Sequence, residues 1–554
     1  MHVIKLITLA AFSSTAFALP VVNHNDDAPW HDLLISRLET VRHNAGVRGG
    51  SVAVVHGDKT WLHAFGHKDL EQTQPVDVDT SFLIGSCTKS FTALGAAKAV
   101  AQGKLYYDKP LNDYVRDFYP EYLGLWDPVA NEKVTLADVL AHRTGVAGDF
   151  PVILAWNTTE RLLQHLKHVP PSFPYNGTHT PFQYNNIMYG LAGFLTAKAN
   201  GNGGDWASMI RRDIFGPLGM NASTATLDDF LAKPNRSPGL DPGTDAIEDS
   251  VLPAESAGAI SSTARDFGKY AHALLKTFRG EADPLALTKE VFAPFREKQG
   301  EVPDGLQQLL ATVGLLGGRN ISSDVSYTFG FWKTQWRNYT FFTHGGDNSG
   351  YTANLCVLPE ANLAVTVQTN ADGPHGCFRD LACAVAFDTV LGFTDSTSYD
   401  CLSLPPNPIP APLPALPLPA SVYTGVFESP IMGQLVVTDD AHGNLTAAVG
   451  ERHKFLDSPL YATLGFPDGP AKGPLPGATP DSIQLSGLNL MGMPHFFVAK
   501  TTVGENNTTV IGGYYYALDR DMTKICEEPG IGCQDFFKRV DGPTTTPPKC
   551  HARS

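Results

Sequence analysis

A serine and a lysine three residues apart are the first residues in this sequence whose types and spacing could do chemistry. Ser86 and Lys89 are followed by apolar residues at helical spacing from Phe91 to Val100, which predicts a helix start at or near Ser86. Residues three apart on a helix share one face, so the lysine amine would stand beside the serine hydroxyl. A lysine that takes the proton of a serine makes that serine a nucleophile for acyl transfer. Unpaired backbone N–H groups at the helix start would point at the reacting oxygen.

Two later segments carry groups that would complete such a site. Tyr184-Asn-Asn186 precedes a helical run through Leu195, and the phenol could share the proton transfer with the lysine. The second segment, Thr343-His-Gly-Gly-Asp-Asn-Ser-Gly-Tyr351, lies between two strand-like runs. Its glycines would let the strand backbone approach a substrate closely.

The order of these motifs is S-x-x-K, then Y-x-N, then a glycine-rich strand with His-Gly-Gly, and it resembles the serine beta-lactamase and penicillin-binding-protein family. The likeness is to the class C side of that family, with its esterase, DD-peptidase and D-aminopeptidase relatives, and it covers residues from about 30 to 395. Flanking segments agree with the family in the same order: Gly66-His-Lys-Asp-Leu70, Asp79-Thr-Ser-Phe82, Val139-Leu-Ala-His-Arg-Thr-Gly145 and Ser256-Ala-Gly-Ala-Ile-Ser-Ser-Thr-Ala-Arg-Asp266.

The resemblance implies a serine hydrolase in which Ser86 attacks a carbonyl and forms an acyl-enzyme. Lys89 and Tyr184 would share the movement of the serine proton, so we expect depressed pKa values for both. Backbone N–H groups of Ser86 and Asp347 would hold the oxyanion. Asn186 would orient the substrate, and the full substrate-binding set is Asn186, His344, Gly345, Gly346 and Asp347.

One departure from the family pattern bears on the substrate. Many beta-lactamases and DD-peptidases carry Lys-Thr-Gly where this chain has His344-Gly-Gly346, and that lysine helps to hold a substrate carboxylate. Histidine is neutral or only partly charged at pH 7, and Asp347 adds a negative neighbour. The sequence therefore favours esters or small amides, with true beta-lactamase or D-amino-acid peptidase activity as alternatives. A non-catalytic relative that binds a ligand in the cleft or in the C-terminal barrel is the rival class.

The beginning of the chain has the pattern of a secretory signal peptide over residues 1–18, with Lys5, an apolar core and Ala16-Phe-Ala18 as the cleavage signal. We therefore expect a secreted, extracellular protein. The formal net charge of −15 argues against nucleic acid and anionic membranes as partners and leaves a small-molecule ester, amide or lactam. The oligomeric state is left open.

Secretion would allow asparagines to be glycosylated and cysteines to form disulfides. Glycans are expected on surface loops at Asn157, Asn176, Asn221, Asn320, Asn338, Asn444, Asn506 and Asn507, with Asn235 a poorer acceptor because Pro238 follows its sequon. Eight cysteines should mostly pair in an oxidising compartment, and Cys526 with Cys533 is a local candidate. Cys87 is expected to be buried, either free or bridged to a strand cysteine such as Cys356. A cysteine nucleophile is disfavoured because the lysine lies three residues after Ser86.

The fold that would position the site is α/β (α+β), of the serine beta-lactamase/transpeptidase type. It has an antiparallel sheet with helices and an all-helical region. We expect a helix over 30–45, strands over 50–56 and 59–66, a helical middle over 86–275, strands over 327–336, 339–343, 351–358 and 362–370, and a helix over 377–391. This beta-lactamase-like domain would span 19–400.

Three further segments follow the catalytic region. A proline-rich linker is predicted over 401–419 and a disordered tail over 541–554. Between them, residues 420–540 predict a small β-rich domain, an antiparallel barrel or sandwich, whose placement resembles the lipocalin-like domain of some family hydrolases. No cofactor and no metal are expected. His63 and His67 lie four apart but have no third ligand nearby in the sequence.

Overall fold

The structure is a computed structural model, and it describes most of the chain up to residue 399 together with the strands of the C-terminal region. The described residues are 29–118, 124–148, 156–169, 171–240, 251, 253–371, 377–394, 399, 424–429, 433–439, 445–449, 458–463, 482–490, 493–501, 509–514 and 537–539. The predicted signal peptide, linker and tail lie outside them, so the predicted domain boundaries remain predictions.

A seven-stranded, fully antiparallel sheet organises the larger part of the molecule. Its strands lie in the order β2-β1-β9-β8-β7-β6-β5, so the sheet is assembled from both ends of the catalytic region, as the sequence predicted. The strands are β1 Gly49–His56, β2 Lys59–Gly66, β5 Ser326–Tyr327, β6 Trp332–Trp336, β7 Tyr339–Asn348, β8 Tyr351–Leu358 and β9 Leu363–Thr369.

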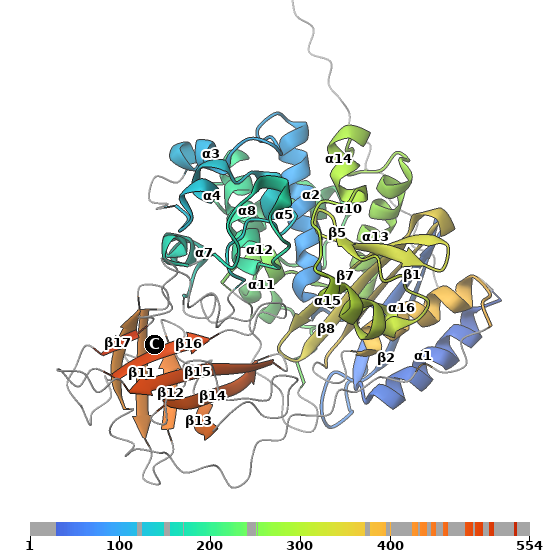
Figure 1. Ribbon diagram of the computed structural model, residues 1–554. Coiled ribbons are helices and arrows are strands. Elements are labelled where there is room, and N and C mark those ends of the chain that lie inside the picture. Colours follow the sequence, from blue (N-terminus) through green and yellow to red (C-terminus); the bar gives the residue numbers. More distant parts are fainter. Residues whose placement is uncertain are drawn as a thin grey trace, which may run out of the picture.

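Two helices at the ends of the catalytic region cover one face of this sheet. They are α1 His31–Ala45 and α16 Cys377–Val390, which pack against each other (Figure 1). In α1 the buried residues Leu34, Leu38 and Val41 follow the helical repeat, so burial of this apolar stripe explains how the helix docks. Helix α13 Ala264–Arg279 covers the other face at β1 and β9.

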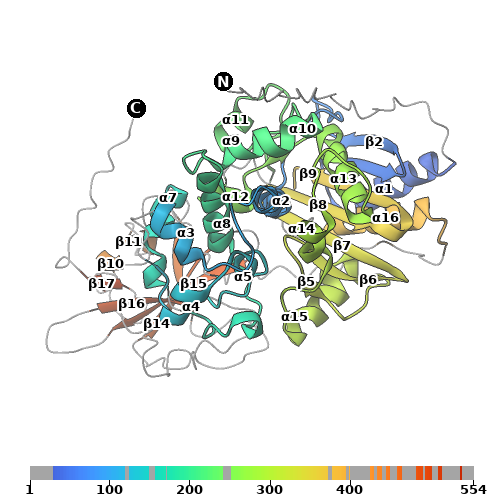
Figure 2. The same ribbon diagram turned by 90° about the horizontal axis from the view of Figure 1, so that it is seen from above.

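A helical region lies on one side of the sheet and carries the S-x-x-K and Y-x-N motifs. Helix α2 Thr88–Ala101 runs through the middle of the molecule, between the other helices and the sheet (Figure 2). It is buried on nearly all sides, and its small residues allow α8 Asn186–Ala199 and α12 Glu255–Gly258 to pack closely against it. The remaining helices are α3 Leu111–Phe118, α4 Pro128–Lys133, α5 Leu136–Leu140, α7 Thr159–Gln164, α9 Trp206–Ile210, α10 Gly216–Leu218, α11 Leu227–Leu231, α14 Lys289–Arg296 and α15 Asp304–Leu309.

The C-terminal strands close into an antiparallel barrel, which agrees with the predicted β-rich region. The strands are β10 Gly425–Ser429, β11 Gly433–Asp439, β12 Leu445–Val449, β13 Ser458–Thr463, β14 Ser482–Leu490, β15 Met493–Thr501, β16 Thr509–Tyr514 and β17 Phe537–Arg539. The barrel lies beside the helical region near α7 (Figure 1). At this boundary a Cβ added to Gly433 would come within 3.3 Å of the Trp156 ring.

The predicted strands around the third motif differ from the observed ones in two ways. The single strand expected over 327–336 is two strands, because the chain turns at Gly330, whose φ of +78° suits glycine, and Thr328 N–H donates to the Phe331 carbonyl. The strand expected to end at Thr343 continues as β7 to Asn348, paired with β8 through the whole motif. The His-Gly-Gly segment therefore lies within the strand, as expected of a glycine-rich strand, rather than beyond the end predicted at Thr343.

The disulfide alternatives for Cys87 are also decided. Cys356 on β8 bonds to Cys383 on α16, while Cys87 is a free, buried thiol. The sheet itself explains this outcome, because α16 and Cys87 lie on opposite faces of it. Cys377 is disulfide-bonded as well, whereas Cys526 and Cys533 lie outside the described residues.

The Cys356–Cys383 bond should stabilise the packing of α16 on the sheet. It closes a loop with a sequence separation of 27 residues, for which chain entropy alone corresponds to about 3 kcal/mol. We expect the double variant Cys356→Ala/Cys383→Ala to lower the free energy of unfolding by that order in urea titrations. An unchanged unfolding midpoint would contradict this expectation.

Candidate active site

A short turn of 3₁₀ helix, Gly85–Cys87, holds Ser86 directly ahead of α2, which confirms the predicted helix start to within two residues. Strand β3 Phe82–Leu83 pairs with β4 Ser261–Ser262 and sets this turn against the sheet. Gly85 has φ of +49°, and a Cβ there would lie 2.4 Å from the Asp347 nitrogen. Only glycine allows the nucleophile turn to come this close to β7.

Lys89 is completely buried and its amine contacts the serine hydroxyl. The Nζ atom lies 2.8 Å from Ser86 Oγ, 2.6 Å from Asn186 Oδ1 and 2.9 Å from the Ala257 carbonyl oxygen. Burial lowers the pKa of Lys89 well below its ordinary value, as the sequence predicted. A neutral amine has two N–H groups and one lone pair. With the two N–H groups donated to Asn186 and Ala257, the lone pair is left for the Ser86 proton.

Tyr184 stands on the other side of the serine, and its pKa is raised rather than depressed. Burial is the main cause, and it outweighs the hydrogen bond with Ser86, which acts to lower the pKa. The expectation of a depressed tyrosine pKa was wrong because the sequence does not show how far the phenol is removed from water. In this arrangement Tyr184 is a neutral phenol, and Lys89, whose Nζ lies 4.8 Å from the phenol ring centroid, is the better proton acceptor.

The loop that carries Tyr184 is held by a histidine that was not predicted as a site residue. The backbone N–H of Asn185 donates to His142 Nδ1 at 3.0 Å, and that of Gln183 donates to the His142 carbonyl at 2.7 Å. The Asn185 side chain caps α8 by accepting from Met188 N–H. His142 has φ of +57°, a conformation unusual for a residue with a side chain. The segment 139–145, quoted above for its family resemblance, was the signal that pointed to it.

Two backbone N–H groups come together where an oxyanion would form. A Cβ added to Gly346 would lie 2.9 Å from the Ser86 nitrogen and 1.9 Å from the Ile84 carbonyl oxygen. Together with the approach of Gly85 to the Asp347 nitrogen, this places the N–H groups of Ser86 and Asp347 side by side. Glycine at positions 345 and 346 keeps the strand backbone bare at this point.

His344, predicted to bind substrate, is buried among aromatic rings. Its Nδ1 lies 2.6 Å from the Gly345 carbonyl, which can only accept, so Nδ1 carries the hydrogen and Nε2 accepts from the Tyr327 hydroxyl at 2.9 Å. Burial lowers the pKa of His344 to about 3, so this histidine is neutral at pH 7. The ring lies 6.2 Å from the Tyr184 ring, so it lines the site without supplying charge.

The acidic neighbour of the oxyanion position, Asp347, is paired. Arg379 of α16 contacts the Asp347 carboxylate and donates to the Gly346 carbonyl at 3.0 Å. Arg379 also lies 3.3 Å from Asp380, and the pKa of Asp380 is raised by burial to about 6 despite this cation. No motif in the sequence pointed to Arg379.

The predicted glycosylation sites within the described residues are mostly available. The exposed ones are Asn157, Asn176, Asn221, Asn320 and Asn338, whereas Asn444, Asn506 and Asn507 lie outside the described residues. Asn235 differs, because its amide donates to Asp77 and its oxygen accepts from Lys68 and Thr80. A glycan on Asn235 would have to break these contacts.

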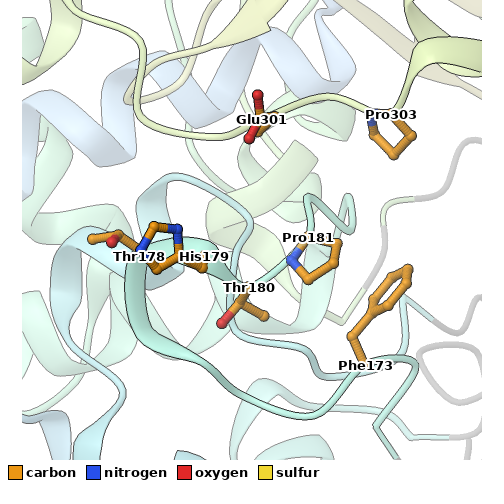
Figure 3. A pocket seen from close by; sticks show the side chains of 7 residues that line it. All are labelled: Phe173, Thr178, His179, Thr180, Pro181, Glu301 and Pro303. Carbon is orange, nitrogen blue, oxygen red and sulfur yellow. The ribbon is translucent and has the colours of Figure 1, made fainter.

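A surface pocket of about 330 Å³ lies between the loop before Tyr184 and the loop around Glu301 (Figure 3). It contains none of the groups that contact Ser86, so it is separate from the chemistry. Its lining residues are Phe173, Thr178, His179, Thr180, Pro181, Glu301 and Pro303. Thr178 belongs to the Asn176 sequon.

Two features are absent from the described residues, a metal-binding cluster and a membrane-spanning helix. Within them, three or more metal-ligating side chains nowhere gather into a group that could hold an ion. No helix in the described part of the chain has the length and apolar character needed to span a membrane.

The buried neutral His344 gives a testable pH dependence of stability. Its folded pKa of about 3 lies below its ordinary value of 6.5, so between these pH values the unfolded chain binds one more proton than the folded one. Acidification through this window should therefore reduce the free energy of unfolding by about 1.4 kcal/mol per pH unit from this group alone. His344→Gln, which cannot titrate, should lose that part of the slope in denaturant titrations from pH 7 to pH 4. Equal slopes in both proteins would argue against a buried neutral histidine.

Comparison with known proteins agrees with the geometry. The family model described as Beta-lactamase matches residues 34–387. An unguisins hydrolase from Aspergillus campestris is 25% identical over 543 residues, covering 90% of each chain, and one from Aspergillus violaceofuscus is 25% identical over 72% of this chain and 75% of its own. Penicillin-binding protein 4 of Amycolatopsis lactamdurans is 25% identical over 71% of this chain and 96% of its own.

Solved structures share the fold. A penicillin-binding protein homologue from Pyrococcus abyssi aligns with a TM-score of 0.53 at 20% identity, over 88% of this chain and 99% of its own. A class C beta-lactamase from Rhodobacter sphaeroides aligns with a TM-score of 0.50 at 21% identity, over 65% of this chain and 99% of its own. Since the family model covers well over half of the sequence, this chain belongs to the Beta-lactamase family and has its serine hydrolase fold.

Proposed function

We propose that this protein is a secreted serine hydrolase that cleaves a small ester or amide through an acyl-enzyme on Ser86. The observation that carries the proposal is the contact of 2.8 Å between Ser86 Oγ and a completely buried lysine amine. A buried amine without its own carboxylate partner is neutral more readily than one in water, so it can accept a proton. Membership of the Beta-lactamase family, whose members are generally serine hydrolases, supports the proposal.

The proposed reaction uses the groups in a fixed order. Ser86 Oγ bonds to the carbonyl carbon of the substrate while its proton passes to Lys89 Nζ. The carbonyl oxygen becomes negative and accepts hydrogen bonds from the N–H groups of Ser86 and Asp347. Collapse of this intermediate breaks the bond to the leaving group, which takes a proton from the neighbouring Tyr184 and Lys89 pair. Water then attacks the acyl-enzyme by the reverse use of the same groups and releases Ser86.

The charges around the serine favour substrates without a carboxylate near the scissile bond. His344 is neutral, burial lowers the pKa of Lys89 and so favours its neutral form, and the charge of Arg379 is directed at Asp347 and Asp380. Among the residues that the structure describes, a substrate carboxylate would meet Asp347 and no cation of its own, because Arg379 is paired with Asp347. This charge pattern supports esters and neutral amides over lactams, and the names of the unguisins hydrolases reported above make an unguisin a substrate to test.

The alternatives are a beta-lactamase or a D-amino-acid peptidase among enzymes, and a ligand-binding relative without catalysis. The ligand-binding alternative would need the three candidate catalytic groups to be lost or separated. In this chain Ser86, Lys89 and Tyr184 are present and lie in mutual contact. Secretion is supported by the sequence pattern of residues 1–18 and by five exposed sequons.

A covalent labelling experiment tests the nucleophile. We expect wild type to gain the mass of a fluorophosphonate adduct after deglycosylation, and Ser86→Ala to gain none. Cys87→Ser is the matched control, because that thiol is buried, donates to the His344 carbonyl and has a pKa raised by burial, and it should label like wild type. The probes for turnover are a nitrophenyl ester, a D-amino-acid anilide, a chromogenic cephalosporin and an unguisin. A folded wild-type protein that neither labels nor turns over any of them would favour the ligand-binding alternative.

The protonation state of Lys89 makes a separate prediction about pH. Because burial lowers its pKa well below the ordinary 10.5, the amine should lose its proton at a lower pH than a lysine in water. The value of kcat/KM for a neutral ester should then be level by pH 10 and fall on acidification as Lys89 gains a proton. Tyr184→Phe should have a lower kcat/KM than wild type, and its kcat/KM should fall on acidification in the same way. A rate that keeps rising through pH 10 would instead indicate an ammonium at neutral pH.

A further inference from the structure

Arg379 lies beneath one of the two peptide units that form the proposed oxyanion site, the unit that joins Gly346 to Asp347. It is the third residue of α16, on the face of the sheet opposite Ser86, and its side chain is 19% exposed. A Cβ added to Gly345 would lie 3.2 Å from its Cζ atom, so the guanidinium rests against bare strand backbone. From there Nη1 donates to the Gly346 carbonyl at 3.0 Å and contacts the Asp347 carboxylate.

The geometry of the peptide bond connects this contact to the oxyanion. The carbonyl of Gly346 and the N–H of Asp347 belong to one planar trans peptide unit, so they point in opposite directions. A cation that holds the carbonyl on one side therefore fixes the direction of the N–H on the other. Hydrogen bonding to the carbonyl also polarises the unit and strengthens the N–H as a donor.

The guanidinium is itself held on its far side by Asp380 of the same helix, which side chains of the sheet hold in turn. Its Nε lies 3.3 Å from Asp380, whose other oxygen accepts from Asn354 Nδ2 at 2.7 Å. The Asn354 oxygen accepts from the Thr343 hydroxyl at 2.8 Å, which returns the chain of contacts to β7. Burial opposes the charge of Arg379, but Asp347 and Asp380 outweigh that effect and keep its pKa above the ordinary value.

We propose that Arg379 is a positioning residue that orients and polarises the Gly346–Asp347 peptide, and so sets the strength of the oxyanion site. The inference rests on the proposed function of Ser86. The forked guanidinium suits this task because it reaches the carbonyl, the Asp347 carboxylate and Asp380 together, whereas an ammonium presents a single point of charge. Its positive charge also lies one peptide unit away from the negative charge that develops in the reaction.

The test compares Arg379 with a second arginine of similar burial that is remote from Ser86. Arg337, in the turn between β6 and β7 at the other end of the strand, pairs with Asp388 of the same helix at 3.1 Å and is 16% exposed. We expect Arg379→Gln to reduce kcat and the rate of fluorophosphonate labelling by roughly 10- to 100-fold with KM changed little, since one oxyanion donor is misplaced. Arg379→Lys, which keeps the charge, should recover part of the loss. Arg337→Gln should cost comparable stability and leave kcat at the wild-type value.

The outcomes separate the inference from the proposed function. If Arg379→Gln, Arg379→Lys and Arg337→Gln all keep the wild-type kcat and labelling rate, the positioning role is wrong and the Ser86 mechanism stands. If Arg379→Gln does not fold, the same comparison is made with Arg379→Lys and Asp380→Asn. Both variants keep a cation at position 379. If wild type itself shows no Ser86-dependent labelling, the proposed function fails and the inference fails with it.

Discussion

The contact between Ser86 and the buried amine of Lys89 is the interaction on which the rest of the site depends. An ammonium removed from water is unfavourable, so burial favours the neutral amine that a proton acceptor must be. Burial in turn requires α2 to be enclosed on nearly all sides, and α8, α12, α9 and α14 pack against it. The same packing that stabilises the middle of the molecule thus sets the protonation state of its candidate base.

Close approach between two backbones is the second constraint. The turn at Gly85 and the strand at Gly346 touch so tightly that a Cβ at either position would clash with the other segment. This approach brings together two N–H groups that are more than 250 residues apart in the sequence. Pairing of β7 with β8 along its full length, and Arg379 from the opposite face, hold the strand side of the contact.

The electrostatic character of the site depends on which of its titratable groups are neutral and which are paired with an opposite charge. His344 lies where family relatives carry a lysine, yet its hydrogen bonds and its burial keep it neutral. Asp347, which would oppose an anionic substrate and a developing oxyanion alike, is matched by Arg379. The result is a site built around hydrogen-bond donors and neutral groups, which is suited to polarising a carbonyl rather than to holding an ion.

The sequence by itself determined the motif residues, their order and the elements that carry them. We could predict Ser86 before a helix, Tyr184 before α8 and the glycine-rich strand from the sequence. Helix starts, the alternation of side chains in a strand and the positions of glycines are local properties of the chain. The antiparallel sheet and the C-terminal barrel could be anticipated for the same reason. Predictions that depended on burial and on which face a residue occupies had mixed success: the lowered pKa of Lys89 and the burial of Cys87 were predicted correctly, and others were not. The raised pKa of Tyr184, the enclosure of His344, the pairing of Cys356 with Cys383 and the placement of Arg379 were decided only by tertiary structure. Desolvation, ion pairing and disulfide geometry depend on neighbours brought from distant parts of the chain, and no local pattern in the sequence records them.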